Sequence, residues 1–369
     1  MTRRRVVVAG LGDSGLLTAI KLAGAHDVIG ISTKPGLLSG QELGVRLSRP
    51  DDWARDYWIP FERFRGLDRV QTIQGTLTGA DFAARTVTVR RADGTETAVG
   101  YDALVIATGV INGFWRTPDV QTEAEVTHSL RAAHQRLAAA DSVMVLGGGA
   151  AAVSSAANLA AVWPGKTVRL YFPGERPLRD HHHRTWAAVR RRLVDSGVQL
   201  HAGHRAQVPA GFDFGAITDE PVHWCTGQPP ATADAVLWTI GATTPNTDWL
   251  PETILDEQGF VCVVPDLRVP RADGVFAIGD VAATDPLRSS ARNRADKLLA
   301  HNVTAWFDGA PLRQYRPAAR KWGSVLGTQP DGLEVFAPSG YRFRFPAWSV
   351  ERVVRPWIVG RGIYGGIRG

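Results

Sequence analysis

Three glycines in the first fifteen residues have the spacing of a turn that binds a pyrophosphate. Gly10, Gly12 and Gly15 follow the β-branched run at 6–8 in the pattern G-x-G-x-x-G. In this pattern the first glycine forms a tight turn, the second lets the backbone approach the phosphates, and the third lets the next helix pack closely. A helix starting near Ser14 would point its positive N-terminal end at the pyrophosphate. Such turns also follow strands in proteins that bind no nucleotide, so this motif alone is weak.

A second unit of strand, glycine turn and helix is predicted at 143–162. Gly147 and Gly149 take the first two glycine positions, and Ala152 stands at the third. The two glycine units are the only internal repeat in the sequence. Their repetition predicts a second nucleotide site.

The acidic residue that commonly binds ribose hydroxyls at the end of the second strand is missing from both units. The strand predicted at 26–31 is followed by Ser32, and the strand predicted at 168–172 ends in Phe172. Arg176 lies just beyond, where it could pair with the 2′-phosphate of NADP or belong to a solvated loop. Together with Ala152, which is compatible with NADP-type turns, this slightly favours NADPH over NADH.

Strands and helices alternate through the parts of the chain that would position these residues. Helical segments are predicted at 16–23 and 287–306, and residues 35–65 form an excursion that contains helix. Further strands are predicted at 70–77, 86–91, 101–109, 198–201, 235–241 and 275–280, with a hairpin turn at 92–95.

The composition is that of an ordinary soluble globular chain. Of the 369 residues, 44% are hydrophobic and 21% are charged, which suits two or three domains. The net charge of +6 comes almost entirely from arginine, and a guanidinium binds phosphate bidentately. No basic run is dense enough to make nucleic acid the first choice of partner. No apolar run is long enough to predict a transmembrane helix.

Cysteine usage argues against two kinds of chemistry. Cys225 and Cys262 are the only cysteines, and their separation provides neither a redox-active C-x-x-C pair nor a cysteine zinc site. This usage fits a reducing, cytoplasmic setting. The histidines at 181–183 are consecutive and point in different directions in regular structure, so no metal site is expected there.

Four short motifs together carry a family resemblance. The glycine turns at 10–15 and 147–149, Ala-Thr-Gly at 107–109 and Ala-Ile-Gly-Asp at 277–280 resemble the two-dinucleotide-binding flavoprotein superfamily in order and spacing. Within it, the chain is most similar to type II NADH dehydrogenases and to ferroptosis-suppressor and apoptosis-inducing-factor-like quinone reductases. The stretch at 40–47, which contains Arg46, and residues 312–317 also resemble that branch.

The resemblance implies an α/β fold with two Rossmann-like domains. An FAD domain would be discontinuous, at 1–112 and 260–317, with an NAD(P)H domain inserted at 113–259. A small α+β cap would occupy 318–369.

The resemblance also implies two sets of binding residues. The FAD set is Gly10, Gly12, Asp13, Ser14, Gly15, Ser32, Lys34, Arg46, Leu77, Ala107, Thr108, Gly109, Gly279 and Asp280. The NAD(P)H set is Gly147, Gly149, Ala152, Arg176 and Gly241. Ser154 and Arg288 would lie near the flavin and nicotinamide rings, and Ser154 stands where the family usually carries a glutamate. No side chain is expected to act as an acid, base or nucleophile, because hydride transfer needs mainly stacked rings.

The expected function is an FAD-dependent NAD(P)H oxidoreductase that passes electrons to a quinone-like acceptor. One alternative is a reductase of a small ferredoxin- or rubredoxin-type protein, whose acidic surface Arg288, Arg292 and Arg294 would attract. Another is a flavin- or nucleic-acid-binding module with degraded redox function, since the altered motifs permit it. A homodimer is compatible with each of these.

Aromatic residues and arginines alternate in the last thirty residues of the sequence. This mixture suits the headgroup region of a membrane, where relatives bind, and would place the protein in the cytoplasm, peripheral on the inner membrane face. The period of two at 341–345 instead favours a half-buried strand. The residues concerned are Tyr341, Phe343, Phe345, Trp348 and Trp357, with Arg342, Arg344, Arg352 and Arg355.

Overall fold

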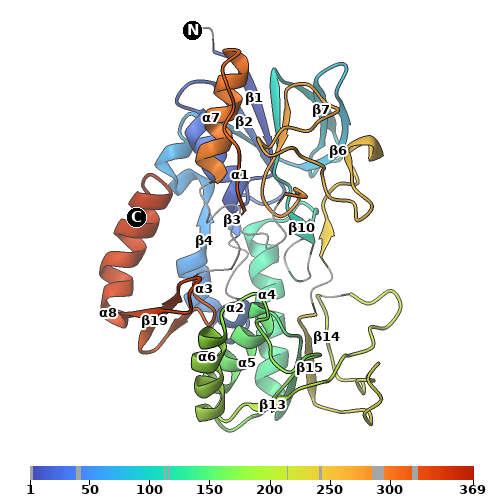
Figure 1. Ribbon diagram of the computed structural model, residues 1–369, viewed down its shortest axis with the longest axis vertical. Helices are drawn as coiled ribbons and strands as arrows, with labels where there is room; N and C mark the ends of the chain where they lie inside the picture. Colours follow the sequence, from blue (N-terminus) through green and yellow to red (C-terminus); the bar gives the residue numbers. More distant parts are fainter. Residues whose placement is uncertain are drawn as a thin grey trace.

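Two sheets of mainly parallel strands, a small antiparallel sheet and a C-terminal unit make up most of the described protein (Figure 1). The computed structural model describes residues 3–38, 43–111, 114, 117–213, 215–240, 243–284, 295–317 and 323–369. The first sheet lies at one end of the long axis and the second sheet at the other, while the C-terminal helix runs along one side.

The first sheet has the strand order β17-β9-β1-β2-β5, and all of its pairs are parallel. Residues 6–9 of β1 are buried on both faces, which explains why this strand is a continuous apolar run. Helices α1 (Asp13–Leu22) and α7 (Ala295–Phe307) pack against each other beside it. The strands are β1 (Arg5–Ala9), β2 (Asp27–Ser32), β5 (Val70–Gln74), β9 (Ala103–Ile106) and β17 (Val275–Ala277).

The strand expected at 70–77 is divided in the structure, so that expectation is wrong in its extent. The chain turns at Gly75, where an added Cβ would lie 2.5 Å from Val89 Cγ1. Beyond this point it leaves the parallel sheet and forms an antiparallel one. The strands of that sheet are β6 (Thr76–Asp81), β7 (Thr86–Arg90) and β8 (Glu96–Gly100).

The second sheet has the order β13-β12-β11-β15-β14, and its pairs are parallel except for β14 with β15. Helices α4 (Glu123–Ala139) and α6 (His183–Asp195), which the sequence analysis did not identify, flank it together with α5 (Ala150–Val162). The strands are β11 (Ser142–Leu146), β12 (Thr167–Tyr171), β13 (Gln199–His201), β14 (Ile217–Thr218) and β15 (Ala235–Trp238).

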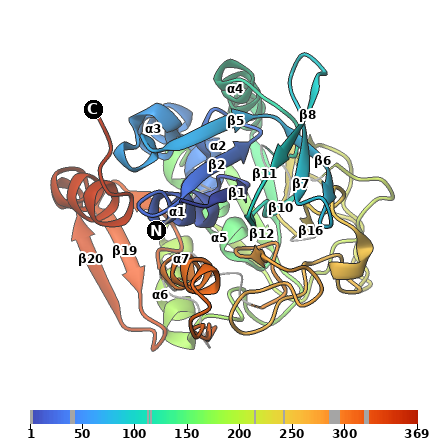
Figure 2. The same ribbon diagram turned by 90° about the horizontal axis from the view of Figure 1, so that it is seen from above.

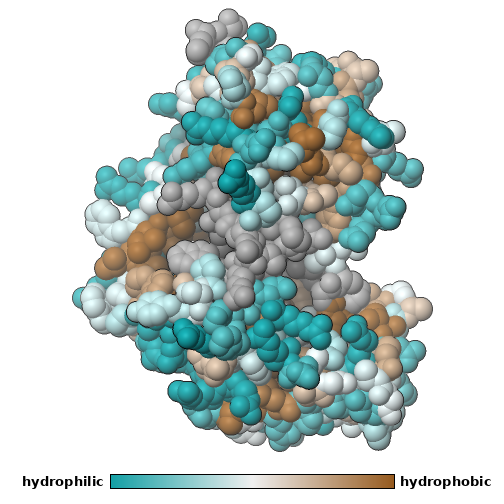
Figure 3. Space-filling view, in the orientation of Figure 1, coloured by the Kyte–Doolittle hydropathy of each residue, from teal (hydrophilic) through white to brown (hydrophobic). Residues whose placement is uncertain are grey.

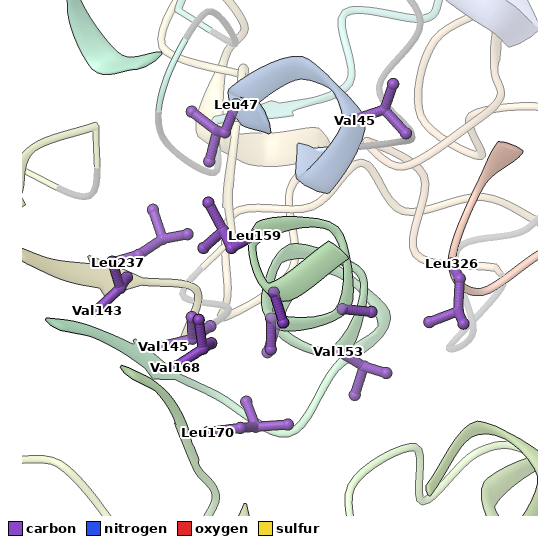
Figure 4. Packing of buried hydrophobic residues seen from close by; sticks show 14 of the residues in the cluster. Val45, Leu47, Val143, Val145, Val153, Leu159, Val168, Leu170, Leu237 and Leu326 are labelled. Atoms are coloured by element: carbon purple, nitrogen blue, oxygen red, sulfur yellow. The ribbon is translucent and has the colours of Figure 1, made fainter. Parts of the chain in front are cut away.

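Helix α5 is the centre of the largest core. Figure 4 shows α5, with Leu159 on it, between sheet residues such as Val145 on one side and α2 (Leu43–Ser48), with Val45 and Leu47, on the other. The approach of α2 is close because a Cβ on Gly44 would lie 2.3 Å from the Ser154 carbonyl oxygen. This contact joins the segment after β2 to α5, the helix that packs on the second sheet.

The remaining short elements connect the two sheets. The outgoing β10 (Val110–Ile111) and the returning β16 (Thr244–Pro245) pair antiparallel, so the chain crosses between the sheets twice at one place. The excursion after β2 contains β3 (Gly36–Leu38), α3 (Pro50–Tyr57), β4 (Trp58–Pro60), η1 (Phe61–Arg63) and η2 (Arg65–Leu67), and η3 (Glu252–Ile254) follows β16.

The C-terminal unit is an antiparallel sheet followed by a helix. Strands β18 (Thr328–Gln329), β19 (Gly332–Phe336) and β20 (Arg342–Pro346) precede α8 (Ala347–Ser349) and η4 (Val350–Ile363). Figure 2 shows β19 and β20 on the side of the molecule opposite β6, β7 and β8. In β20 Phe343 and Phe345 are half-buried while Arg342 and Arg344 are exposed, which confirms the expected half-buried strand.

Candidate functional site

A cavity of about 1630 Å³ lies where the two sheets and the C-terminal unit meet. Both glycine turns line it, each at the carboxyl edge of its own parallel sheet. Ligands of open α/β sheets bind at this edge, outside the ends of the strands.

The three glycines of the first turn have the separate roles that the sequence predicts. Gly10 has φ +101°, and a Cβ there would lie 2.4 Å from the Ala107 carbonyl oxygen. A Cβ on Gly15 would lie 1.9 Å from the Gly10 carbonyl oxygen, so this glycine is required by packing. At Gly12, by contrast, a Cβ would meet nothing within 4 Å. Gly12 therefore faces open space in the cavity, beside the first turn of α1.

The second glycine turn repeats this arrangement. Gly147 has φ +142°, and a Cβ there would lie 2.5 Å from the Thr239 carbonyl oxygen. A Cβ on Gly149 would meet nothing within 4 Å, and α5 begins at the next residue. Ala152, which replaces the third glycine, is fully buried. The second turn therefore also presents one open glycine and one helix N-terminus to the cavity.

Most of the residues expected around FAD come together at this cavity. Gly15 lies behind the turn, and Arg46 lies apart from the cavity, buried on α2 with its guanidinium 5.3 Å from the Trp53 ring centroid. Those that line the cavity are Gly10, Gly12, Asp13, Ser14, Ser32, Lys34, Leu77, Ala107, Thr108, Gly109, Gly279 and Asp280.

The residues expected around NAD(P)H are only partly brought together. Gly147, Gly149 and Ser154 line the cavity, whereas Arg176 does not. Ser154 is buried where α2 contacts α5, and its hydroxyl donates a 3.5 Å hydrogen bond to the Leu326 carbonyl. Gly241, Arg288, Arg292 and Arg294 lie outside the described residues.

Lys34 connects the end of β2 to the chain that leads into the second sheet. Its Nζ donates hydrogen bonds to the carbonyl oxygens of Thr117 at 2.8 Å and Asp119 at 2.9 Å. Burial lowers the pKa of Lys34 to about 8, against the opposing attraction of the Asp119 carboxylate. The backbone N–H of Lys34 donates a 3.2 Å hydrogen bond to Ser32 Oγ, at the position where the usual ribose-binding carboxylate is missing.

The C-terminal unit closes one side of the cavity with apolar side chains. Two polar contacts fix it there: Tyr364 donates a 3.1 Å hydrogen bond to Asp13 Oδ1, and Arg355 pairs with the buried Asp56 at 2.6 Å. We call the apolar residues that this unit contributes to the cavity the apolar wall. They are Leu333, Val335, Phe343, Phe345, Val350, Val354, Ile358, Val359 and Ile363.

Sequence reasoning missed a group of aromatic and basic residues at the second sheet's end of the cavity. Tyr171, His204, Arg205 and Trp224 all line the cavity. They belong to three segments that are well separated in the sequence, and no local spacing marks them as a group. The position of Tyr171 at the end of a strand was the one available signal.

Two further site types find no support in the described part of the chain. No group of three histidine, cysteine or carboxylate side chains within it could hold a metal ion. None of its helices is both long and apolar enough to cross a membrane.

Comparison with known proteins gives a family match over most of the chain. Residues 4–307 match the model of the pyridine nucleotide-disulphide oxidoreductase family. The oxidoreductase ptaL of Pestalotiopsis fici is 26% identical over 382 residues, which cover 96% of each chain. The chain spans about half the length of two other curated relatives.

Solved structures share the fold at low sequence identity. The sulfide:quinone oxidoreductase from Aquifex aeolicus has a TM-score of 0.71 and 16% identity, covering 99% of this chain and 92% of that one. The water-forming NADH oxidase from Lactobacillus brevis, bound to NADH, has a TM-score of 0.62 and 20% identity, covering 85% of this chain and 71% of that one.

These matches confirm the expected α/β class with Rossmann-type units and the resemblance drawn from the four motifs. The chain belongs to the pyridine nucleotide-disulphide oxidoreductase family and is an oxidoreductase of that family, which binds FAD and NAD(P)H.

Proposed function

We propose that this protein oxidises NAD(P)H through a bound FAD and passes the electrons to a quinone-like acceptor. One observation carries the proposal: two glycine turns and the apolar wall all border a single cavity. Hydride transfer between two dinucleotides requires stacked rings, and two pyrophosphate sites that open into one space favour that arrangement.

The first glycine turn fits the pyrophosphate of FAD. The open space at Gly12 leaves room for phosphate oxygens, and the N-terminus of α1 offers unpaired backbone N–H groups toward them. Asp280 would supply a carboxylate acceptor for a ribityl hydroxyl. Bound FAD would supply the hydride acceptor and the onward transfer of electrons.

The protein's own contribution in this proposal is position rather than proton transfer. Ser154, at the place of the usual family glutamate, packs between α2 and α5 and donates to a backbone carbonyl. It therefore offers no carboxylate to the rings. Gly149 and the N-terminus of α5 would hold the pyrophosphate of NAD(P)H, as Gly12 and α1 hold that of FAD.

The apolar wall supports an apolar, ring-shaped acceptor. Its side chains come from β19, β20 and η4, and the phenyl rings of Phe343 and Phe345 meet at 5.5 Å between centroids in an edge-to-face contact. Such a surface favours an aromatic or quinonoid ring because burial of apolar area provides the binding free energy.

The same C-terminal unit also exposes apolar side chains to the outside. Figure 3 shows apolar residues gathered over the C-terminal helix at the left edge of the molecule. Trp348 is 64% exposed and Trp357 is 58% exposed, with Arg352 and Arg361 on the same helical segment. Aromatic and basic residues together suit a peripheral contact with an anionic membrane, where a lipophilic quinone is dissolved.

An anaerobic absorbance titration tests the proposed function. Purified protein with its flavin is titrated with NADPH, then in a parallel sample with NADH, and a soluble quinone is added last. We expect the flavin band to bleach with at least one nucleotide and to return with the quinone. A band that neither nucleotide bleaches would contradict the NAD(P)H step, and a band that bleaches but does not return would contradict the quinone-like acceptor.

A further inference from the structure

A stack of aromatic rings closes the cavity at the end of the second sheet. The Tyr171 ring stacks on the His201 ring, with 4.3 Å between ring centroids and 10° between ring planes. It also stacks on the Trp224 ring, with 4.8 Å between centroids and 24° between planes. His204 meets Tyr171 and Trp224 edge-on, at 5.1 Å and 4.9 Å between ring centroids. Tyr171 and Trp224 are buried, so the stack is a rigid surface formed by residues of three separate segments.

The backbone of Arg205 is held beside this stack. Its N–H donates to Thr226 Oγ1 at 3.2 Å, and its carbonyl accepts from the Cys225 N–H at 2.8 Å. Its neighbour Ala206 forms a β-bridge with Trp224. The guanidinium itself is exposed at the cavity and has no hydrogen bond or ion pair with any residue that the structure describes.

The charge at this end of the cavity is positive. Within the described residues that line it, the second sheet and its loops contribute His181, His204 and Arg205 but no carboxylate. The acidic residues of the lining, such as Asp13 and Asp280, come from the first sheet's side. Burial lowers the pKa of His201, and the neighbouring His204 and Arg169 lower it further. An anion is the ligand that this surrounding favours.

His204 adds a second polar group with a defined orientation. Its Nδ1 lies 2.8 Å from the Ala202 carbonyl oxygen, and because a carbonyl can only accept, Nδ1 carries the hydrogen. In the neutral ring Nε2 is then an acceptor, which suits a ligand N–H donor and not the phosphate itself.

We infer that Arg205, beside the Tyr171–Trp224 stack, binds the 2′-phosphate of NADPH and makes this protein select NADPH over NADH. The inference rests on the proposed function and names the nucleotide that it uses. Tyr171 ends β12, the strand that pairs with β11, and β11 leads into the second glycine turn. A nucleotide whose pyrophosphate lies at Gly149 would therefore extend its adenosine along the carboxyl edge of the sheet toward this stack.

The test compares binding of two probes that carry no nicotinamide. Adenosine 2′,5′-bisphosphate and ADP are titrated calorimetrically into the flavin-loaded protein and its variants. We expect Arg205→Gln to weaken the bisphosphate about tenfold while ADP changes less than about twofold, the loss typical of one charge-assisted contact. Arg205→Lys keeps the charge without the bidentate geometry, so its affinity should fall between those of wild type and Arg205→Gln.

Two matched arginines serve as comparisons. Arg191→Gln removes the same charge from an exposed position of α6 away from the cavity, and it should leave both affinities unchanged. Arg176→Gln removes the arginine that follows β12. An unchanged bisphosphate-to-ADP ratio in Arg205→Gln, or a loss confined to Arg176→Gln, would overturn the inference.

Nucleotide kinetics separate this inference from the proposed function. If NADPH and NADH both fail to bleach the flavin while the bisphosphate still depends on Arg205, the proposed function fails and the binding assignment stands. If NADPH bleaches the flavin and the KM ratio of NADPH to NADH is the same in wild type and Arg205→Gln, the function stands and the assignment fails. We expect the KM for NADPH alone to rise, by about tenfold.

Discussion

Tyr364 donates a 3.1 Å hydrogen bond to the carboxylate of Asp13. Tyr364 directly follows η4, and Asp13 is the first residue of α1 and part of the first glycine turn. The two residues are 351 positions apart in the sequence. The ring of Tyr364 also packs edge-on against the ring of Phe64, with 5.3 Å between centroids, and this packing holds the tyrosine in place. The C-terminal unit is thus attached directly to the loop expected to hold the FAD pyrophosphate.

Replacing Tyr364 with phenylalanine should remove this hydrogen bond and keep the ring packing. The free energy of unfolding should fall by about 1 kcal/mol, the usual net worth of one hydrogen bond. The rate of FAD dissociation should rise, because the first glycine turn loses its tie to the C-terminal unit. Urea unfolding and flavin fluorescence measure the two effects. Tyr341→Phe, at a ring that is 70% exposed, is the control and should change neither.

The two kinds of glycine in each turn should respond differently to substitution. Gly12→Val should leave apoprotein stability nearly unchanged and abolish FAD binding, because its side chain would project into open cavity space. Gly10→Ala should instead destabilise the fold by roughly 1–3 kcal/mol, since its φ is +101° and its Cβ would meet Ala107. Thermal unfolding of the apoproteins and FAD titration distinguish them. Equal loss of stability in both variants would contradict this division of roles.

The second glycine turn allows the nucleotide step to be removed by itself. Gly149→Val should retain bound FAD with an unaltered absorbance spectrum but slow flavin reduction by NAD(P)H at least tenfold, as its side chain would occupy the second open position. Stopped-flow reduction measures the rate. Dithionite should still reduce the flavin fully, and loss of FAD from this variant would count against two separate sites.

Lys34 should make the stability of the apoprotein depend on pH in an alkaline window. Its folded pKa of about 8 is below the ordinary lysine value of 10.5, so between these values the unfolded chain binds more protons. The free energy of unfolding contributed by this residue therefore rises from pH 8 to pH 10.5, by up to about 3 kcal/mol. Below pH 8 the lysine is protonated in both states and the slope disappears.

The variant Lys34→Met should lack this rise. Urea unfolding of wild type and Lys34→Met between pH 8 and pH 10.5 measures how steeply the free energy of unfolding of each protein depends on pH. Loss of the hydrogen bonds to Thr117 and Asp119 lowers the stability of the variant by an amount that does not depend on pH, so it does not affect this comparison. Parallel curves for the two proteins would show that Lys34 is not buried as described.

Substitution in the apolar wall should affect the acceptor step alone. Phe343→Ser removes a half-buried ring from the cavity side of β20, so the KM for a soluble quinone should rise several-fold, following the loss of about 1 kcal/mol of apolar burial. The rate of flavin reduction by NADPH should not change. Trp348→Ser, on the exposed side of the same unit, is the comparison and should leave the soluble-quinone KM unchanged.

Local patterns in the sequence predicted the parts of the fold that local physics determines. The β-branched run of β1, the two glycine turns and the alternation at 341–345 each form the expected element. Helix α4 was missed although its N-terminus has a capping box, in which Thr122 and Glu125 bond each other's backbone N–H groups. That signal was present in the sequence and would have identified the helix.

Other features could not be predicted because they depend on contacts between distant segments. The division of the strand at Gly75 arises from Val89 on another strand. Arg46 stood in a stretch that resembles relatives, but its burial beside Trp53 depends on how α2 packs. The stack of Tyr171, His201 and Trp224 brings together three segments whose spacing has no period.

The pairing of β10 with β16 has a mechanical consequence. Both connections between the sheets pass through one two-stranded ladder, and Thr108 and Asn246 exchange hydrogen bonds of 2.8 and 3.0 Å beside it. Two adjacent crossings have the geometry of a hinge. Rotation of the second sheet about this hinge would separate Gly44 of α2 from Ser154 of α5, which are packed at backbone contact. The stiffness of the cavity therefore depends on the fit between these two helices as well as on the crossings.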